Sequence, residues 1–165
     1  MKITVSNAIA AGPPLVFGAL VDPGVLRSSI PGCQTLTVIG PDAYEATLKI
    51  GVAGLKGIYQ GTAAVLDQRP FESLTVTFDG KGKTGFVRGS AAITLSADGV
   101  GTLFVCDADV QVGGLIAAVG SRLVQAAARK LADAFFRQLR RELKTDEEPG
   151  ADSGSKTTEE SETVD

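Results

Sequence analysis

Two adjacent stretches decide the fold: residues 101–112, GTLFVCDADVQV, and residues 115–144, LIAAVGSRLVQAAARKLADAFFRQLRRELK. In the first stretch, apolar and polar side chains alternate, which is typical of a strand with one buried face. The buried face is predicted to consist of Phe104, Cys106, Ala108, Val110 and Val112. Asp107 and Asp109 fall on the opposite face, where we expect them to meet solvent.

The second stretch has the spacing of one long amphipathic helix. It contains no proline and only one glycine, Gly120, and it is rich in strong helix formers. Its apolar side chains recur on one arc, which we expect to face the core: Leu123, Val124, Ala127, Ala128, Leu131, Ala134, Phe135 and Leu139. Phe136 falls instead on the polar side, between Arg129 and Arg140.

The rest of the chain reads as one strand, two short helices and a series of strands. Pro13-Pro14 and Pro23 suit first helical turns, and Asp22 is a candidate cap for the second helix. Pro31-Gly32 then ends that helix. The expected strands cover residues 2–11, 34–39, 44–52, 57–67, 73–80, 86–96 and 101–112. Their short linkers predict antiparallel neighbours.

This order predicts an α+β helix-grip fold over residues 1–144. A seven-stranded curved antiparallel sheet and two short helices would be covered by the long C-terminal helix. Because the core residues are small and aromatic residues few, we expect an apolar cavity between helix and sheet. Its predicted lining, which would bind the ligand, is Leu48, Ile50, Val52, Tyr59, Val76, Phe78, Ile93, Phe104, Cys106, Ala108, Leu123, Ala127 and Leu131.

The composition limits the chemistry. The chain has no histidine and only two cysteines, which excludes a Ser-His-Asp triad, a Cys-His dyad and a histidine metal site. Cys33 and Cys106 could form one disulfide by count, and a reduced pair is the other possibility. We expect no metal, no catalytic residues and no covalent cofactor. The uncharged run at residues 3–21 alternates and is interrupted by prolines, so it predicts a strand in a soluble protein rather than a signal peptide.

Charge divides the chain in two. Residues 145–165 contain eight acidic residues and one lysine, which predicts a disordered acidic tail. The end of the helix is basic, and its cations would either be solvated or contact anionic lipid headgroups or a partner. We predict that membrane or partner contact involves Arg129, Phe136, Arg137, Arg140, Arg141 and Lys144, with Phe136 as an interfacial anchor. Because an aromatic stacking platform is missing, nucleic acid is not an expected partner.

Four motifs give the chain a resemblance to the carbon monoxide dehydrogenase G-subunit family of the START-like (SRPBCC) superfamily. They are DPGVLRSSIPGC (22–33), YEATLKIGVAGLKGIYQGTAAVLD (44–67), FDGKGKTGFVRGSAAITL (78–95) and GTLFVCDADVQVGGLIAAVGSRLVQAAARKLADAFFRQL (101–139). The similarity extends over about residues 3–143. Many family members end in a membrane-associating tail, whereas this tail is acidic.

The resemblance implies a non-catalytic accessory protein of a molybdenum-containing carbon monoxide dehydrogenase or a related molybdenum hydroxylase. It would carry an apolar ligand, a quinone such as menaquinone, between that enzyme and the electron-transport chain. We would expect it in the cytoplasm, peripheral at the inner face of the cell membrane. Two alternatives remain open from the sequence: a recruitment adaptor with no ligand, and a lipid-modifying or cyclase-type enzyme.

Overall fold

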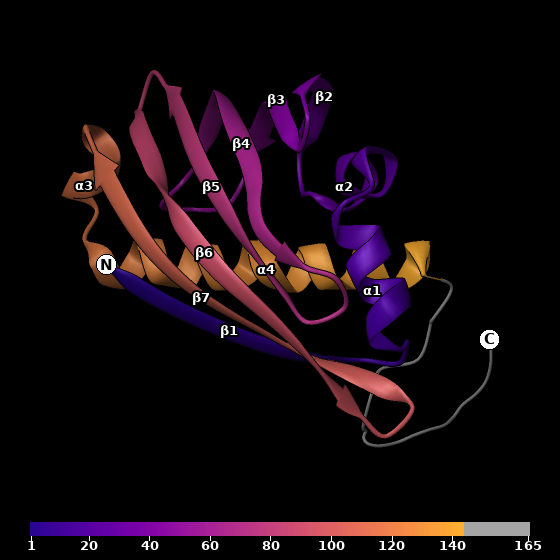
Figure 1. Ribbon diagram of the computed structural model, residues 1–165. Helices are drawn as coiled ribbons and strands as arrows, with labels where there is room; N and C mark the ends of the chain where they lie inside the picture. Colours follow the sequence, from indigo (N-terminus) through magenta and orange to yellow (C-terminus); the bar gives the residue numbers. More distant parts are fainter. Residues whose placement is uncertain (144–165) are drawn as a thin grey trace.

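A seven-stranded antiparallel sheet forms the centre of the computed structural model, which describes residues 1–143 (Figure 1). The strand order is β1-β7-β6-β5-β4-β3-β2. The strands are β1 (Lys2–Ile9), β2 (Cys33–Gly40), β3 (Ala43–Ile50), β4 (Gly57–Arg69), β5 (Ser73–Gly82), β6 (Gly85–Asp98) and β7 (Gly101–Gly113). The helices are α1 (Pro13–Leu20), α2 (Pro23–Ser29), α3 (Leu115–Ala118) and α4 (Ser121–Glu142). The predicted helix-grip fold is therefore confirmed.

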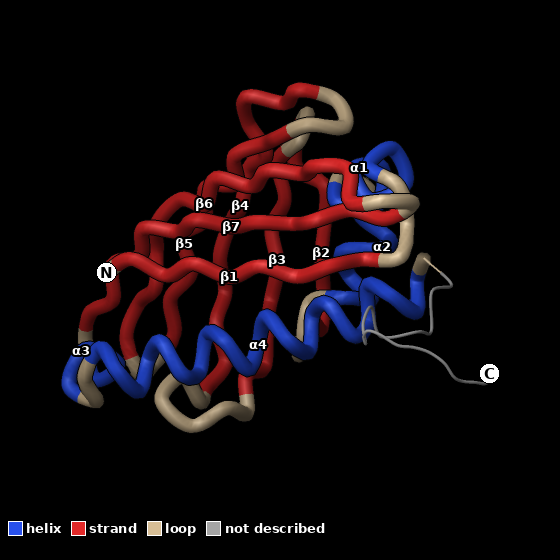
Figure 2. Tube along the Cα trace, turned by 90° about the horizontal axis from the view of Figure 1, so that it is seen from below, coloured by secondary structure: helices blue, strands red, loops and turns tan. Residues whose placement is uncertain are grey.

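The helix α4 runs across one face of the curved sheet (Figure 2). Helices α1 and α2 lie near its C-terminal end, and α3 lies at its N-terminal end. Residues 144–165, which include the predicted acidic tail, lie outside the described residues. The domain boundary at residue 144 therefore stays a prediction.

The corner between α2 and β2 is built as its residues indicate. Asp22 caps α2, because its Oδ1 accepts hydrogen bonds from the backbone N–H of Gly24 at 2.8 Å and of Val25 at 3.3 Å. Gly32 has a φ of 74°, and a Cβ there would lie 2.0 Å from the carbonyl oxygen of Lys49. Only glycine fits this close approach, so Pro31-Gly32 sets the start of β2 against β3.

The prediction of one continuous helix from residue 115 is wrong. The segment is divided into α3 and α4 at Gly120, whose φ of 94° is incompatible with an α-helix. Short α3 is instead tied to the sheet, because the backbone N–H of Ile116 donates to the carbonyl oxygen of Thr84 at 3.0 Å. Ile116 is buried while Leu115 stays exposed.

The prediction that Phe136 is an interfacial anchor is also wrong, because its side chain is only 2% exposed. Its ring meets Phe104 of β7 edge to face, with centroids 4.8 Å apart, and also contacts Phe135. Near its C-terminal end, α4 packs against α2 and β1 as well as the sheet face. More of the helix circumference is therefore buried there than in a helix that packs against one surface only.

Apolar side chains pack in two separate clusters. The larger one joins α1, α4 and the sheet around residues such as Val16, Phe104 and Leu139. The smaller cluster consists of Ile50, Leu55, Tyr59, Ile116, Val124 and Ala127, with partly buried neighbours. The core is thus divided along the length of α4.

Candidate functional site: an apolar cavity

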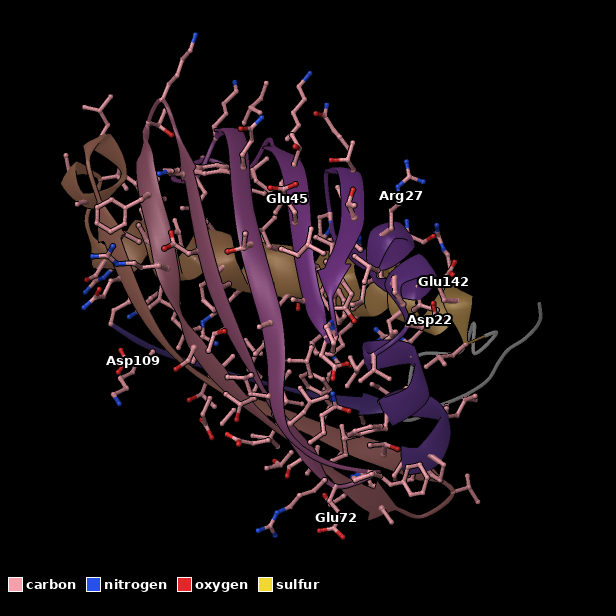
Figure 3. All side chains as sticks on the ribbon, turned by 45° about the horizontal axis from the view of Figure 1, so that its top comes forward. Asp22, Arg27, Glu45, Glu72, Asp109 and Glu142 are labelled. Carbon is pink, nitrogen blue, oxygen red and sulfur yellow. The ribbon has the colours of Figure 1, made fainter. Side chains whose placement is uncertain are left out.

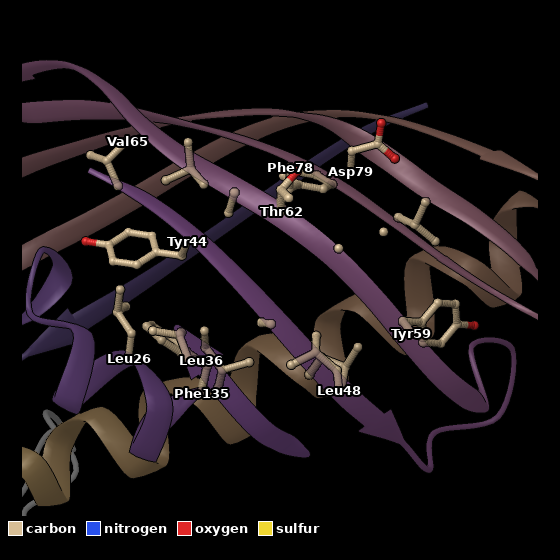
Figure 4. Close-up of a pocket in the computed structure, with 18 of the residues that line it drawn as sticks. Leu26, Leu36, Tyr44, Leu48, Tyr59, Thr62, Val65, Phe78, Asp79 and Phe135 are labelled. Atoms are coloured by element: carbon tan, nitrogen blue, oxygen red, sulfur yellow. The ribbon is translucent and has the colours of Figure 1, made fainter. Parts of the chain in front are cut away.

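A cavity of about 420 Å³ lies between the sheet and the helices (Figure 4). Residues of both core clusters line it, with Leu74 and Phe104 from the larger and Leu55 and Tyr59 from the smaller. Nearly all of its surface is carbon, from strands β2 to β7 and from α1, α2 and α4. The volume falls within the range of about 300–1,000 Å³ that is usual for small-molecule sites.

Part of the sheet lining has no side chains. Gly61 of β4 and Gly80 of β5 are direct partners in the sheet register, and both line the cavity. The neighbouring pair on the same face, Ala63 and Phe78, carries side chains. A Cβ on Gly61 would lie 2.2 Å from the carbonyl oxygen of Asp79, so the close strand approach itself requires glycine there. This glycine pair leaves space that larger residues would fill.

Two tyrosines lie toward opposite ends of the cavity, with their hydroxyls directed away from its centre (Figure 4). The Tyr59 hydroxyl donates to the carbonyl oxygen of Leu55 at 2.8 Å and lies 3.3 Å from Thr84 Oγ1. At Tyr44, burial and the negative charges of Asp42 and Asp22 raise the pKa of the phenol. The Tyr44 ring therefore stays neutral near pH 7, and the centre of the cavity is apolar.

Carboxylates lie on the outside of the sheet. Asp79 borders the cavity at its backbone, but its side chain is exposed and points away from the cavity in Figure 4. Asp107 and Asp109 are exposed as predicted, and Figure 3 shows Asp109 projecting outward from the ribbon. Asp107 accepts a hydrogen bond from Thr4 Oγ1 at 2.8 Å, and Asp109 pairs with Lys2 at 3.5 Å.

The structure brings eight of the thirteen predicted lining residues to the cavity. These are Leu48, Ile50, Tyr59, Val76, Phe78, Ile93, Phe104 and Leu131. Ligand contact by any of them stays a prediction.

The other five do not line the cavity. Cys106 and Val52 pack against the larger and the smaller core cluster respectively. Ala127 is buried inside the smaller cluster, whereas Leu123 is 42% exposed. Ala108 lies on β7 between Ile3 and Ala91, toward the β1 edge. The prediction extended too far toward this edge and along α4, because alternation identifies a buried face but not which part of it stays open.

Outside the central strands, sequence reasoning missed Leu55 of the β3–β4 connection and five further lining residues at the other end of the cavity. The five are Leu20, Leu26, Ile30, Leu36 and Phe135. They close the cavity at the end formed by α1, α2 and β2. The apolar spacing within residues 13–30 was the available signal, since short helices that bury one face must cover some part of the sheet.

The predicted contact residues at the end of α4 do not form one free patch. Arg129 donates to the carbonyl oxygen of Thr4 at 3.0 Å, and Arg140 donates to Asn7 Oδ1 at 2.8 Å, so both tie α4 to β1. Arg137 and Arg141 are exposed. Phe136 belongs to the core, and Lys144 lies outside the described residues. These side chains point to different sides of α4, so they do not form the single patch that was predicted.

Cys33 and Cys106 are free thiols, so the disulfide alternative is not realised in the described structure. Burial raises the pKa of both thiols; the charge of Arg27 partly opposes this at Cys33, and Asp107 adds to it at Cys106. The thiolate, which is the reactive form, is therefore less populated in the folded protein.

We expect both thiols to react with iodoacetamide more slowly in the folded protein than in urea at the same mildly alkaline pH. The two rates should approach each other as the pH rises, because a raised pKa postpones ionisation. Mass-spectrometric counting of alkylated sites over time measures this. Two thiols that react at equal rates in both states would contradict the assigned burial.

Among the described residues, no group of three or more cysteine, aspartate or glutamate side chains is placed to hold a metal ion. Within residues 1–143, none of the helices has the length and hydropathy needed to cross a bilayer.

Comparison with solved structures identifies related folds. A conserved protein from Geobacillus kaustophilus is 31% identical, with a TM-score of 0.84 over 87% of this chain and 95% of that chain. A START superfamily protein from Mycobacterium smegmatis is 12% identical, with a TM-score of 0.69 over 87% of this chain and 97% of that chain. The second likeness concerns the fold alone. No curated protein matches the chain.

The family comparison covers nearly the whole described domain. The model for the G subunit of carbon monoxide dehydrogenase (CoxG) matches residues 6–144, which span every helix of the described residues and the second half of the first strand. The match includes the segments that form the cavity, from α1 through α4. With its START-like sheet and covering helix, this chain belongs to the carbon monoxide dehydrogenase G-subunit (CoxG) family.

Proposed function

We propose that this protein binds an apolar ligand, a quinone such as menaquinone, in the cavity between sheet and helices. It would carry this ligand between a molybdenum-containing carbon monoxide dehydrogenase, or a related hydroxylase, and the electron-transport chain. The single observation that supports this most is the cavity of about 420 Å³ with its almost wholly apolar lining. Membership of the CoxG family supports the choice of partner enzyme.

The arrangement of polar groups favours binding over catalysis. General acid–base catalysis needs an ionisable group in reach of the ligand, with a pKa near the working pH. The Tyr59 hydroxyl is engaged in a hydrogen bond to the carbonyl oxygen of Leu55. The pKa of the Tyr44 phenol is raised, which takes it further above a neutral working pH. The Asp79 carboxylate faces outward. A site of this composition can hold an apolar molecule and shield it from water.

The carrier proposal is tested with the full-length protein purified from cells that make menaquinone. Organic extraction followed by mass spectrometry is expected to yield about one quinone or isoprenoid per chain. Stripped protein should regain the same amount when it is incubated with menaquinone in detergent micelles. If the protein arrives empty and refuses menaquinone, the carrier proposal fails.

The same measurement distinguishes the adaptor alternative. An adaptor that only recruits the dehydrogenase would bind the enzyme without any quinone. For both functions we propose that the protein is located at the inner face of the cell membrane. Only the carrier function would use the cavity. Arg137 and Arg141, which are exposed on α4, stay predicted contact residues, and we propose the dehydrogenase rather than the membrane as the partner that they contact.

A further inference from the structure

Three chain segments meet at one end of the fold, at the upper left of Figure 1. They are the β3–β4 connection at residues 51–56, the β5–β6 turn around Thr84, and residues 114–123 of α3 and the start of α4. Thr84 lies within hydrogen-bond distance of Tyr59 and accepts from the backbone of Ile116. A Cβ on Gly54 would lie 3.0 Å from Leu123 Cγ, which places the first segment against the third.

The charged side chains of these three segments and of the strand ends next to them are all cations. Residues 49–58, 80–88 and 111–123 contain no aspartate or glutamate. Their charged residues are Lys49, Lys56, Lys81, Lys83, Arg88 and Arg122, all exposed. Within the part of the chain that the structure describes, none of these six takes part in an ion pair. In the sheet register Arg88 lies opposite Asp79, so the positive charge without an opposing carboxylate is that of the lysines and Arg122.

Large apolar side chains are exposed among these cations. Leu115 is 68% exposed and Ile58 is 56% exposed, and Val119 and Leu123 are each more than 40% exposed. We use the name basic end for a set of four exposed cations and four exposed apolar residues: Lys56, Lys81, Lys83, Arg122, Ile58, Leu115, Val119 and Leu123. Mixed apolar and cationic side chains of this kind are typical of a surface that enters the headgroup layer of a bilayer.

The opposite end of the fold provides an internal comparison. It also exposes apolar side chains, including Phe71 and Val100 at the β4–β5 and β6–β7 turns. Its charges, however, are mostly negative, with Asp67, Glu72 and Asp98 against a single Arg69. Figure 3 shows Glu72 at this end, far from the β5–β6 turn. Exposed apolar groups occur at both ends, so charge distinguishes them.

We infer that the basic end docks on an anionic phospholipid bilayer. The cations would be attracted to lipid phosphates, and Leu115, Val119 and Leu123 would reach the apolar boundary below the headgroups. Leu55 and Tyr59 line the cavity and belong to, or contact, the same segments, so docking here places one end of the cavity beside the lipid. This inference rests on the proposed carrier function and adds the surface and the lipid charge it requires.

The test is co-sedimentation of the full-length protein with vesicles. Phosphatidylcholine vesicles are compared with vesicles in which half the lipid is phosphatidylglycerol. We expect binding only to the anionic vesicles, weakened by added salt. The double variant K81Q/K83Q should lose about tenfold or more in affinity. The variant L115S should weaken binding with little change in thermal unfolding, since this side chain is 68% exposed.

Matched variants elsewhere serve as controls. R137Q/R141Q removes two exposed cations from the far end of α4, and L15S/V100S removes exposed apolar side chains near the acidic turns. Both should bind anionic vesicles like the wild type. If R137Q/R141Q loses binding and K81Q/K83Q keeps it, the basic end is not the docking surface. If the wild-type protein does not bind anionic vesicles and K81Q/K83Q abolishes binding to the dehydrogenase, the surface fits a protein partner. The inference is then overturned.

The outcome for the carrier function is measured separately, by quinone binding without vesicles. K81Q/K83Q should bind menaquinone like the wild type, because neither lysine lines the cavity. Vesicle binding without quinone binding would remove the carrier proposal and leave the docking surface in place. Quinone binding without vesicle binding would do the reverse.

Discussion

Replacing Phe136 with alanine is expected to lower the free energy of unfolding by about 3–5 kcal/mol. The ring is 2% exposed, and its edge-to-face contact with Phe104 holds α4 against β7. Alanine would leave a hole between helix and sheet that neighbours fill only in part. Urea unfolding followed by circular dichroism measures the change.

The adjacent residue provides the control. Arg137 is exposed, so R137A should change the free energy of unfolding by no more than about 0.5 kcal/mol. The two positions differ by one residue in sequence and by their side of the helix. If F136A kept full stability and lost vesicle binding, Phe136 would be an interfacial side chain and the assigned core would be wrong.

Replacing Gly80 with phenylalanine is expected to reduce menaquinone binding about tenfold or more while the fold is kept. A Cβ at Gly80 would have its nearest neighbours at 3.8 Å and 4.0 Å, which is ordinary van der Waals contact. The ring would lie over Gly61, its partner in the register, and would fill the space that the glycine pair leaves open. An aromatic ring placed across a strand glycine also tends to stabilise a sheet. Mass spectrometry of extracted quinone and isothermal titration both measure the loss.

The control places the same ring on the other face of the same strand. Thr77 alternates with the cavity-lining Val76 and Phe78, so T77F should leave quinone binding unchanged. Gly61 is unsuitable for the test, since a Cβ there would collide with the backbone of β5. If G80F is folded and still binds menaquinone like the wild type, the ligand site lies elsewhere.

Some of the cavity could be predicted because strand alternation is a local property. Leu48 and Ile50 of β3 alternate with polar residues, as do Val76 and Phe78 of β5, and the structure brings all four to the cavity. Proline, glycine and Asp22 likewise mark the ends of α1 and α2 through their own backbone preferences. These signals depend on residues close together in the chain, so no tertiary information is needed to interpret them.

The errors have the opposite origin. Phe136 was assigned to the polar side because helical periodicity assumes one buried face, whereas α4 is covered by α2 and β1 as well. The predicted continuous helix is divided at Gly120, and the backbone of α3 is instead hydrogen-bonded to Thr84, more than thirty positions away in the sequence. Arg129 and Arg140 were expected on one basic surface, but they donate hydrogen bonds to β1, which is more than 120 positions away in the sequence.

The sequence by itself determined the order of the elements, the inward face of β3, β5 and β7, and the subgroup of START-like domains to which the chain belongs. Only the tertiary structure decided where the core stays open and which cations gather. The glycine pair depends on the register between β4 and β5, and the basic end depends on three loops folding together. Both arise from contacts between distant residues, and a pattern along the chain does not encode the distance between them.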